Sequence, residues 1–251
     1  MMSDPRYAWV RQLAALAVLL VVWEAAGHAG YLNPLYMPTP TQIWGALAEL
    51  FGGGSIWPHM QATFTAALGG LALGIVVGIT LGVLAALIRP VAELLEPVML
   101  LLNAIPRVIL APLFVIWFGI GLGSKIALAF ILVAVVIFFT VFTGIRQVDK
   151  KLVERVVTLG GSRIDLLRQV YLPSVAAWVL GNLKVAVGFA FTGAVVGEFV
   201  AASRGLGYLL SFAQSTYNAA LMLALVLLIM AVVLVIFALA GRLEKRLLRW
   251  S

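Results

Sequence analysis

Charged side chains inside apolar segments are the first candidates for chemistry in this sequence, because a charge surrounded by hydrocarbon is costly to keep. Arg107, Lys184 and Glu198 stand inside such segments. Each cation could line the path of an anion, reach the interface with its long side chain, or pair with a carboxylate; for Lys184 we favour a structural role. For Glu198, an ion pair with Arg204 that fixes the following turn is favoured over contact with a substrate.

The sequence has no grouping of side chains suited to covalent or metal-assisted catalysis. It contains no Cys, and His28 and His59 have no other metal-ligand residues nearby. The nearest approach to a phosphate-binding loop is GIGLGSK at 119–125, which ends in Ser-Lys where G-x-x-x-x-G-K-[ST] has Lys before the hydroxyl residue. We interpret it as a tight turn. The chain is therefore expected to be neither an enzyme nor the holder of a cofactor.

The composition indicates which elements position these residues. The chain of 251 residues is 63% hydrophobic and 11% charged, with a mean hydropathy of +1.11. Its apolar runs reach the roughly 20 residues of a membrane-spanning helix and lack the alternation of barrel strands. We predict an all-α polytopic membrane protein with six transmembrane helices, the third of them broken or kinked at Pro97, Pro106 and Pro112. The predicted spans are 10–27, 62–88, 93–118, 125–144, 174–199 and 219–241.

The distribution of Lys and Arg predicts the orientation of these spans. Placing the N-terminus inside leaves only Lys125 and Arg204 in outer connections. Both termini are therefore expected to be cytoplasmic, and the net charge of +7 needs no nucleic-acid partner. The cytoplasmic connections and tails would then hold Arg6, Arg11, Arg89, Arg146, Lys150, Lys151, Arg155, Arg163, Arg168, Arg242, Lys245, Arg246 and Arg249.

The longest polar insert lies in the fourth connection, at 149–170. Between Lys150 and Leu159 its apolar residues share one helical face, Gly160-Gly161 can end that helix, and Ser162 with Asp165 forms the pattern of a capping box. We predict a helix–turn–helix that lies across the cytoplasmic end of the bundle. An amphipathic helix resting on lipid headgroups is the alternative that the pattern leaves open.

The spacing of this insert matches a known motif. Glu154, Gly160 and the sequence Val170-x-Leu172-Pro173 occur at the offsets of E-A-A-x3-G-x9-I-x-L-P, although Arg155 and Val156 replace the two alanines. This pattern resembles the coupling loop of ABC-importer permeases. MPTPTQIW at 37–44, IPRVILAPLFVIWFGIG at 105–121 and GEFVAASRGLGYLL at 197–210 are similar to the first periplasmic loop, the third span and the segment after the fifth span of the nitrate/sulfonate/taurine branch, which includes pyrimidine-precursor importers.

The resemblance implies a type I ABC-importer permease in a bacterial inner (plasma) membrane. Residues 1–251 would form a single permease domain with its core at 62–241, paired with a second copy. Two cytoplasmic ATPase subunits would bind ATP and Mg, and a periplasmic or lipid-anchored binding protein would deliver the substrate. The 149–170 loop would contact the ATPase, and the residues expected to couple the two are Glu154, Arg155, Leu159, Gly160, Gly161 and Ser162.

Small residues recur at every fourth position of the second span: Ala66, Gly70, Gly74, Gly78, Gly82 and Ala86. This pattern predicts close packing of another helix, from the same or another subunit.

The cations Arg107 and Lys184 favour a small anion such as a sulfonate or nitrate as substrate, with a pyrimidine precursor as the alternative. A secondary, ion-coupled transporter and a membrane-embedded enzyme are the competing classes. The first would need an ion-coupling site and the second a catalytic cluster.

Overall fold

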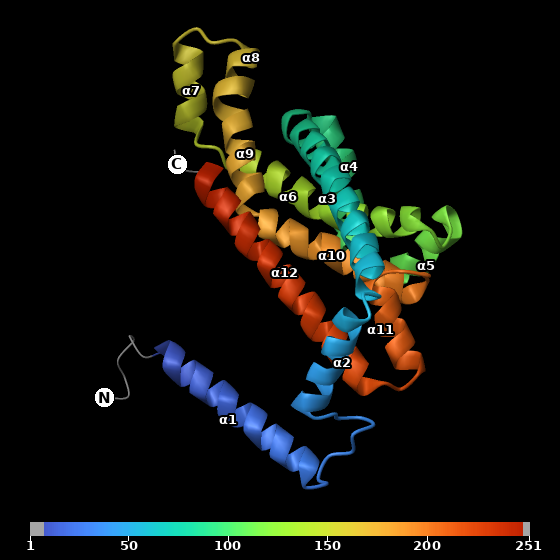
Figure 1. Cartoon of the computed structure of the whole chain (residues 1–251). Coiled ribbons are helices and arrows are strands. Elements are labelled where there is room, and N and C mark those ends of the chain that lie inside the picture. The colour runs from blue at the N-terminus through green and yellow to red at the C-terminus, as the bar shows by residue number, and fades with distance from the viewer. Residues whose placement is uncertain (1–7, 248–251) are drawn as a thin grey trace. The chain divides into compact units, whose positions relative to one another are not determined.

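The computed structural model describes residues 8–247, except for the side chains of Ala8, Arg107, Arg163, Leu243 and Leu247. All regular secondary structure in this range is helical, as predicted. The helices form two compact units. The first contains the described residues up to Trp57 together with Leu209–Met230, and the second contains Pro58–Tyr208 and the described residues from Ala231 onward. Figure 1 shows the course of the chain through these helices.

The first unit begins with the long apolar helix α1 (Ala8–His28), as predicted, and continues with α2 (Pro40–Gly52). The latter helix was missed, because 37–44 was interpreted as a loop. Thr39 and Gln42 form a capping box, with Thr39 N donating to Gln42 Oε1 at 2.9 Å and Pro40 in the first turn. Glu24 of α1 accepts hydrogen bonds from the amide and hydroxyl of Thr41, at 3.0 and 2.6 Å, and so ties α1 to the start of α2.

The second unit is built around α6 (Leu122–Arg146), whose buried residues occupy all sides of the helix. Figure 1 shows α10 (Leu183–Val200) running beside it, and the two helices share a core that includes Val133, Ile137 and Phe191. Since its buried residues lie on all sides, α6 occupies the centre of this unit.

The small-residue face of α3 (Ile56–Leu87) packs against α6 of the same chain. A Cβ added at Gly78 would lie 2.8 Å from Ile137 Cβ, and one at Gly82 would lie 2.9 Å from Val141 Cβ. Gly70 and Gly74 approach Ala129 and Val133 in the same way. The predicted packing role is thus confirmed, and the partner helix is found within the subunit.

Two predicted spans are interrupted in the structure. The third consists of α4 (Arg89–Ala104) and α5 (Arg107–Phe118), which are bent by 108°. The bend lies at Pro106, where the preceding residue, Ile105, is extended, as proline requires. Pro97 and Pro112 lie inside their helices, so of the three predicted positions only Pro106 breaks the span.

The predicted span 174–199 contains α9 (Leu172–Gly181) and α10, separated at Asn182. The side-chain amide of Asn182 donates to Trp178 O at 3.1 Å, a local bond that competes with the helical pattern. Two further helices, α11 (Leu206–Ser215) and α12 (Ala219–Leu247), complete the described chain. Within residues 8–247, five helices are long and apolar enough to span a membrane, or six if the bent α4–α5 pair is one span.

Candidate functional site

The 149–170 insert forms an antiparallel hairpin, which Figure 1 shows at one end of the second unit. Its first helix is α7 (Lys150–Thr158), and its turn is closed by two backbone bonds: Gly160 N to Val157 O at 3.0 Å, and Gly161 N to Val156 O at 2.9 Å. This pair of bonds is a Schellman motif, and Gly160 has the φ of +78° that the motif requires. The predicted glycine stop is confirmed.

The predicted capping box is also present at the start of the second hairpin helix. Ser162 N and Ser162 Oγ donate to Asp165 Oδ2 at 2.8 and 2.6 Å, while Asp165 N donates back to Ser162 Oγ at 3.3 Å. The side-chain and backbone hydrogen bonds from Ser162 hold the pKa of the Asp165 carboxyl below its ordinary value. The turn is therefore stabilised by the capping hydrogen bonds of Ser162 and by the negative charge of Asp165 at the start of the helix.

The second hairpin helix does not end as a short element lying across the bundle. α8 (Arg163–Leu166) passes through a π-helical turn (Leu167–Tyr171) into α9 without leaving the helical conformation. The widened turn, in which Leu172 N donates to Leu167 O, lies directly before Pro173, whose ring cannot fit against the carbonyl of an ideal α-helix. The second hairpin helix thus continues into α9, the first part of the predicted fifth span.

The apolar face predicted for α7 is divided between two environments. Val153 and Val156 are half-buried, whereas Val157 and Leu159 are 56% and 79% exposed, and Ile164 beyond the turn is 61% exposed. These large apolar side chains lie at the tip of a hairpin that is too polar to sit in hydrocarbon. Glu154, Arg155, Gly160 and Ser162 are exposed as well, and Glu154 borders a pocket of about 370 Å³ with Arg146, Lys150 and Tyr171.

A polar network joins α3, the end of α10 and the start of α11. Glu198 is 2% exposed, and its Oε2 accepts hydrogen bonds from Thr63 Oγ1 at 2.8 Å and from Gly207 N at 2.9 Å. The same Thr63 hydroxyl accepts from Leu206 N at 2.8 Å, and His59 Nδ1 lies 3.1 Å from Gly205 N. Three successive amides at the start of α11 are thus bound by three side chains.

The ion pair predicted between Glu198 and Arg204 is not among the ion pairs of the described chain. Glu198 instead turns toward Thr63 and the backbone at Gly207, because the amides at the start of a helix need acceptors. Arg204 is exposed and lines the mouth of a neighbouring pocket.

Lys125 was predicted to lie in an outer connection, but it is 3% exposed in the first turn of α6. Its ammonium group donates to the carbonyl oxygens of Ile120 and Ala201 and to Ser124 Oγ. This side chain therefore joins the turn before α6 to the turn after α10.

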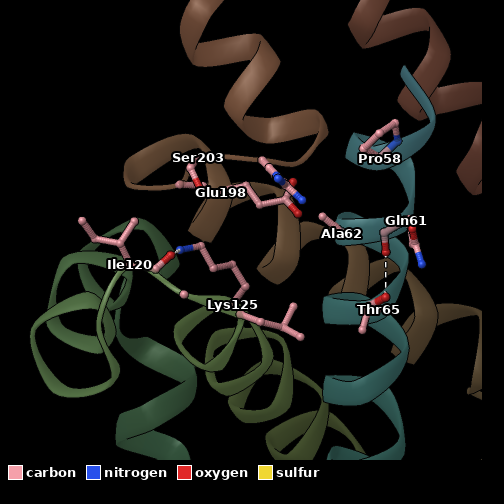
Figure 2. Close-up of a pocket in the computed structure, with 12 residues that line it drawn as sticks. Pro58, Gln61, Ala62, Thr65, Ile120, Lys125, Glu198 and Ser203 are labelled. Carbon is pink, nitrogen blue, oxygen red and sulfur yellow. Dashed lines mark hydrogen bonds between the residues drawn. The ribbon is translucent and has the colours of Figure 1, made fainter. Parts of the chain in front are cut away.

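Glu198 and Lys125 line one pocket of about 340 Å³. Figure 2 shows Gln61, Ala62 and Thr65 of α3 on the opposite side of this pocket from Lys125. The lining is completed by residues of the two turns and the start of α3 and α6: Pro58, Ile120, Gly121, Leu122, Ala202, Ser203 and Arg204.

Lys184 has a carboxylate partner. Its Nζ lies 2.9 Å from Glu244 Oε2 of α12, and its stem packs against Gly241. Pairing with a carboxylate is the structural alternative that the sequence left open. Arg107 begins α5, and its side chain lies outside the described part of the structure.

Sequence reasoning missed Thr63, His59 and Lys125 as parts of the polar network. His59 and Thr63 are four residues apart and precede the small-residue face of α3, which is the signal that could have linked them to a neighbouring helix. For Lys125 no local signal distinguishes a buried clamp from a surface lysine.

The fold and its apolar helices define the class of a polytopic helical membrane protein. Residues 74–249 match the family model described as "binding-protein-dependent transport system inner membrane component", and the chain belongs to this family. It is therefore an ABC-importer permease of the inner membrane, a transport component and not an enzyme, as predicted. This assignment favours the importer over the ion-coupled transporter considered above.

Named relatives place the chain in the nitrate/sulfonate/taurine type. It is 35% identical over 94% of its length to a riboflavin transport system permease protein of Chloroflexus aurantiacus, covering 88% of that protein. It is 29% identical over 95% of its length to a taurine transport system permease protein of Escherichia coli, again covering 88%.

The fold is shared with solved ABC transporters. An inward-facing methionine ABC transporter matches with a TM-score of 0.59 at 20% identity, over 82% of this chain and 94% of the other. An amino acid ABC transporter matches with a TM-score of 0.64 at 16% identity, over 81% and 97%.

Proposed function

We propose that this permease forms the translocation pathway of an ATP-driven importer and is coupled to a separate cytoplasmic ATPase through the α7–α8 hairpin. The observation that carries the proposal is the hairpin tip, where Val157, Leu159 and Ile164 are exposed on a rigid turn. Exposed apolar side chains gathered outside the membrane spans mark a contact with another protein or with the membrane surface, and we assign them to the protein contact. Glu154, Arg155, Gly160, Gly161 and Ser162 belong to the same proposed contact.

The proposed assembly contains two copies of this permease, two ATPase subunits that bind ATP and Mg, and a periplasmic or lipid-anchored binding protein. The chain itself would work as one permease domain, with both termini and the hairpin in the cytoplasm. The concentration of Lys and Arg at the termini and around the hairpin supports this orientation. No cofactor is assigned to the chain.

The proposed substrate is a small molecule with an anionic group, such as a sulfonate or nitrate, and a neutral pyrimidine precursor is the alternative. Relatives named for aliphatic sulfonates and taurine support the anion, and a relative named for formylaminopyrimidine supports the alternative. The pair between Lys184 and Glu244 removes one of the two cations on which the sequence argument for an anion depended. Glu198 remains a proposed pathway residue through the pocket that it lines.

The coupling proposal is tested by placing a charge at the hairpin tip. Leu159→Asp should reduce co-purification of the ATPase and substrate-stimulated ATP hydrolysis, because a carboxylate would have to be buried in the contact. Thr158→Asp, one residue earlier and also exposed, is the matched control. If both variants retain the ATPase at wild-type stoichiometry and transport normally, the hairpin is not the coupling element.

A further inference from the structure

Two buried side chains of opposite charge line the same pocket without forming an ion pair. Glu198 and Lys125 are 2% and 3% exposed, and none of the ion pairs of the described residues joins them. Burying separated charges costs free energy unless each has partners, so the contents of the space beside them matter.

Among the charged groups that line the pocket, the described hydrogen bonds leave one acceptor and one donor group for a ligand. Lys125 has three ammonium protons and three acceptors, so it offers its charge and no free donor. Glu198 uses Oε2 for Thr63 and Gly207, and none of the described hydrogen bonds involves its Oε1. The exposed Arg204 guanidinium at the mouth takes part in none of the described hydrogen bonds or ion pairs.

The walls of the pocket are held in place before any ligand arrives. Lys125 joins the turn at Ile120 to the turn at Ala201, and Glu198 with Thr63 holds the start of α11. A volume of about 340 Å³ falls at the lower end of the range for small-molecule sites. A rigid pocket of this size loses little entropy when it takes up a ligand.

We propose that this pocket binds a small zwitterionic solute, whose ammonium group bonds Glu198 and whose anionic group bonds Arg204 beside the charge of Lys125. Gln61, Thr65 and Ser203 supply further polar contacts at the rim. The pocket would hold the solute on the permease itself during import, and this role rests on the function proposed above. The same chemistry, an ammonium and an anion in one molecule, occurs in a phosphatidylethanolamine headgroup.

Direct binding tests the pocket without the ATPase or the binding protein. The permease in phosphatidylglycerol nanodiscs is titrated with taurine, and in parallel with ethanesulfonate and ethylamine, which each carry one of its two charged ends. Taurine should bind at least about tenfold more tightly than either, since each lost charge-assisted bond is worth about 1.5–3 kcal/mol. No taurine binding, or equal binding of all three, would overturn the proposal.

Variants locate the site. Glu198→Gln keeps a side-chain oxygen for Thr63 and Gly207 but removes the charge, and should weaken taurine at least about tenfold while leaving ethanesulfonate unchanged. Ala62→Phe should block the pocket, whereas Ala72→Phe, on an exposed face of the same helix, is the control. Taurine binding that survives Ala62→Phe would show that it binds elsewhere.

Two further experiments distinguish a free solute from a lipid headgroup as the ligand, and binding to the pocket from a role of the pocket in import. Loss of taurine binding in phosphatidylethanolamine nanodiscs would show that the lipid headgroup occupies the pocket, and would overturn the proposal that the pocket binds a solute. Import is then measured in proteoliposomes that contain the ATPase and the binding protein. If the wild-type protein and Ala62→Phe import equally well, the proposed importer function is supported, but the pocket has no role in import. Absence of import by the wild-type protein would instead count against the proposed function.

Discussion

The Thr63 hydroxyl lies 2.8 Å from Glu198 Oε2, and this bond joins α3 to the end of α10 across 135 residues of sequence. The same hydroxyl accepts from Leu206 N, so one side chain serves as donor to a buried carboxylate and acceptor for the start of α11. Because a buried polar group without a partner is destabilising, Thr63, Glu198 and the 205–207 backbone are expected to behave as one unit.

Replacing Thr63 by Val should destabilise the protein by about 1–3 kcal/mol, because the Leu206 amide would lose its acceptor and Glu198 one of its donors. Thermal unfolding in detergent measures the effect. Thr65→Val is the control, since the exposed Thr65 hydroxyl only donates to Gln61 O of its own helix. Equal melting temperatures for the two variants would contradict a structural role for the network.

Replacing Gly160 by Val should weaken the hairpin turn by about 1–2 kcal/mol, since a β-branched side chain disfavours the left-handed conformation. A Cβ at this position meets nothing within 4 Å, so the cost is conformational only. Gly160→Asn should be tolerated, because Asn adopts this conformation more readily. We expect lower substrate-stimulated ATPase activity for the Val variant at normal membrane insertion, and Val and Asn variants of equal activity would argue against it.

Replacing Gly78 by Ala should separate α3 from α6, because the added methyl group would lie 2.9 Å from Ala134 O and 2.8 Å from Ile137 Cβ. Overpacking of this kind costs about 1–3 kcal/mol. Gly181→Ala is the control, since its Cβ would meet nothing within 4 Å. Thermal unfolding compares them, and a Gly78→Ala protein as stable as wild type would show that the helices can move apart freely.

Replacing Lys184 by Met should destabilise the protein by leaving Glu244 without its partner, whereas Lys184→Met with Glu244→Gln should recover most of the loss. Both side chains are partly exposed, so the effect is expected to be below about 1 kcal/mol. Import of an anionic substrate by the double variant is expected at the wild-type rate. A double variant that is stable but transports no anion would indicate that Lys184 is needed in the translocation pathway.

The hairpin turn should loosen in acid. The pKa of Asp165 is lowered in the folded protein, so its contribution to stability is complete above the unfolded value of about 3.9 and is lost as pH falls through the folded value. Pepsin cleavage of the hairpin in nanodiscs should therefore increase only below about pH 4. Asp165→Asn should abolish this pH-dependent step, and an unchanged pH profile in that variant would refute the assignment.

Features that depend on neighbours along the chain could be predicted from the sequence alone. Composition and run length decided the helical membrane class, and the Gly160 stop and the Ser162–Asp165 cap were readable because capping involves residues within one turn. The spacing from Glu154 to Pro173 likewise indicated the family, because the motif lies within one short stretch of the chain. The positions at which the spans are interrupted were harder to predict from the sequence. Pro97 and Pro112 lie within helices, whereas Asn182 interrupts the predicted fifth span.

Contacts between groups far apart in the sequence could not be predicted and are known from the three-dimensional structure. In the sequence Lys125 looks like a surface lysine, and it is buried only because other elements pack around the start of α6. Glu198 and Lys184 have as partners Thr63 and Glu244, which are 135 and 60 residues away in the sequence. The glycine face of α3 predicted a close approach but not that α6 would make it. Helical periodicity specifies which side of a helix is buried, whereas its partner is selected by the complementary shape of another surface, which no local pattern contains.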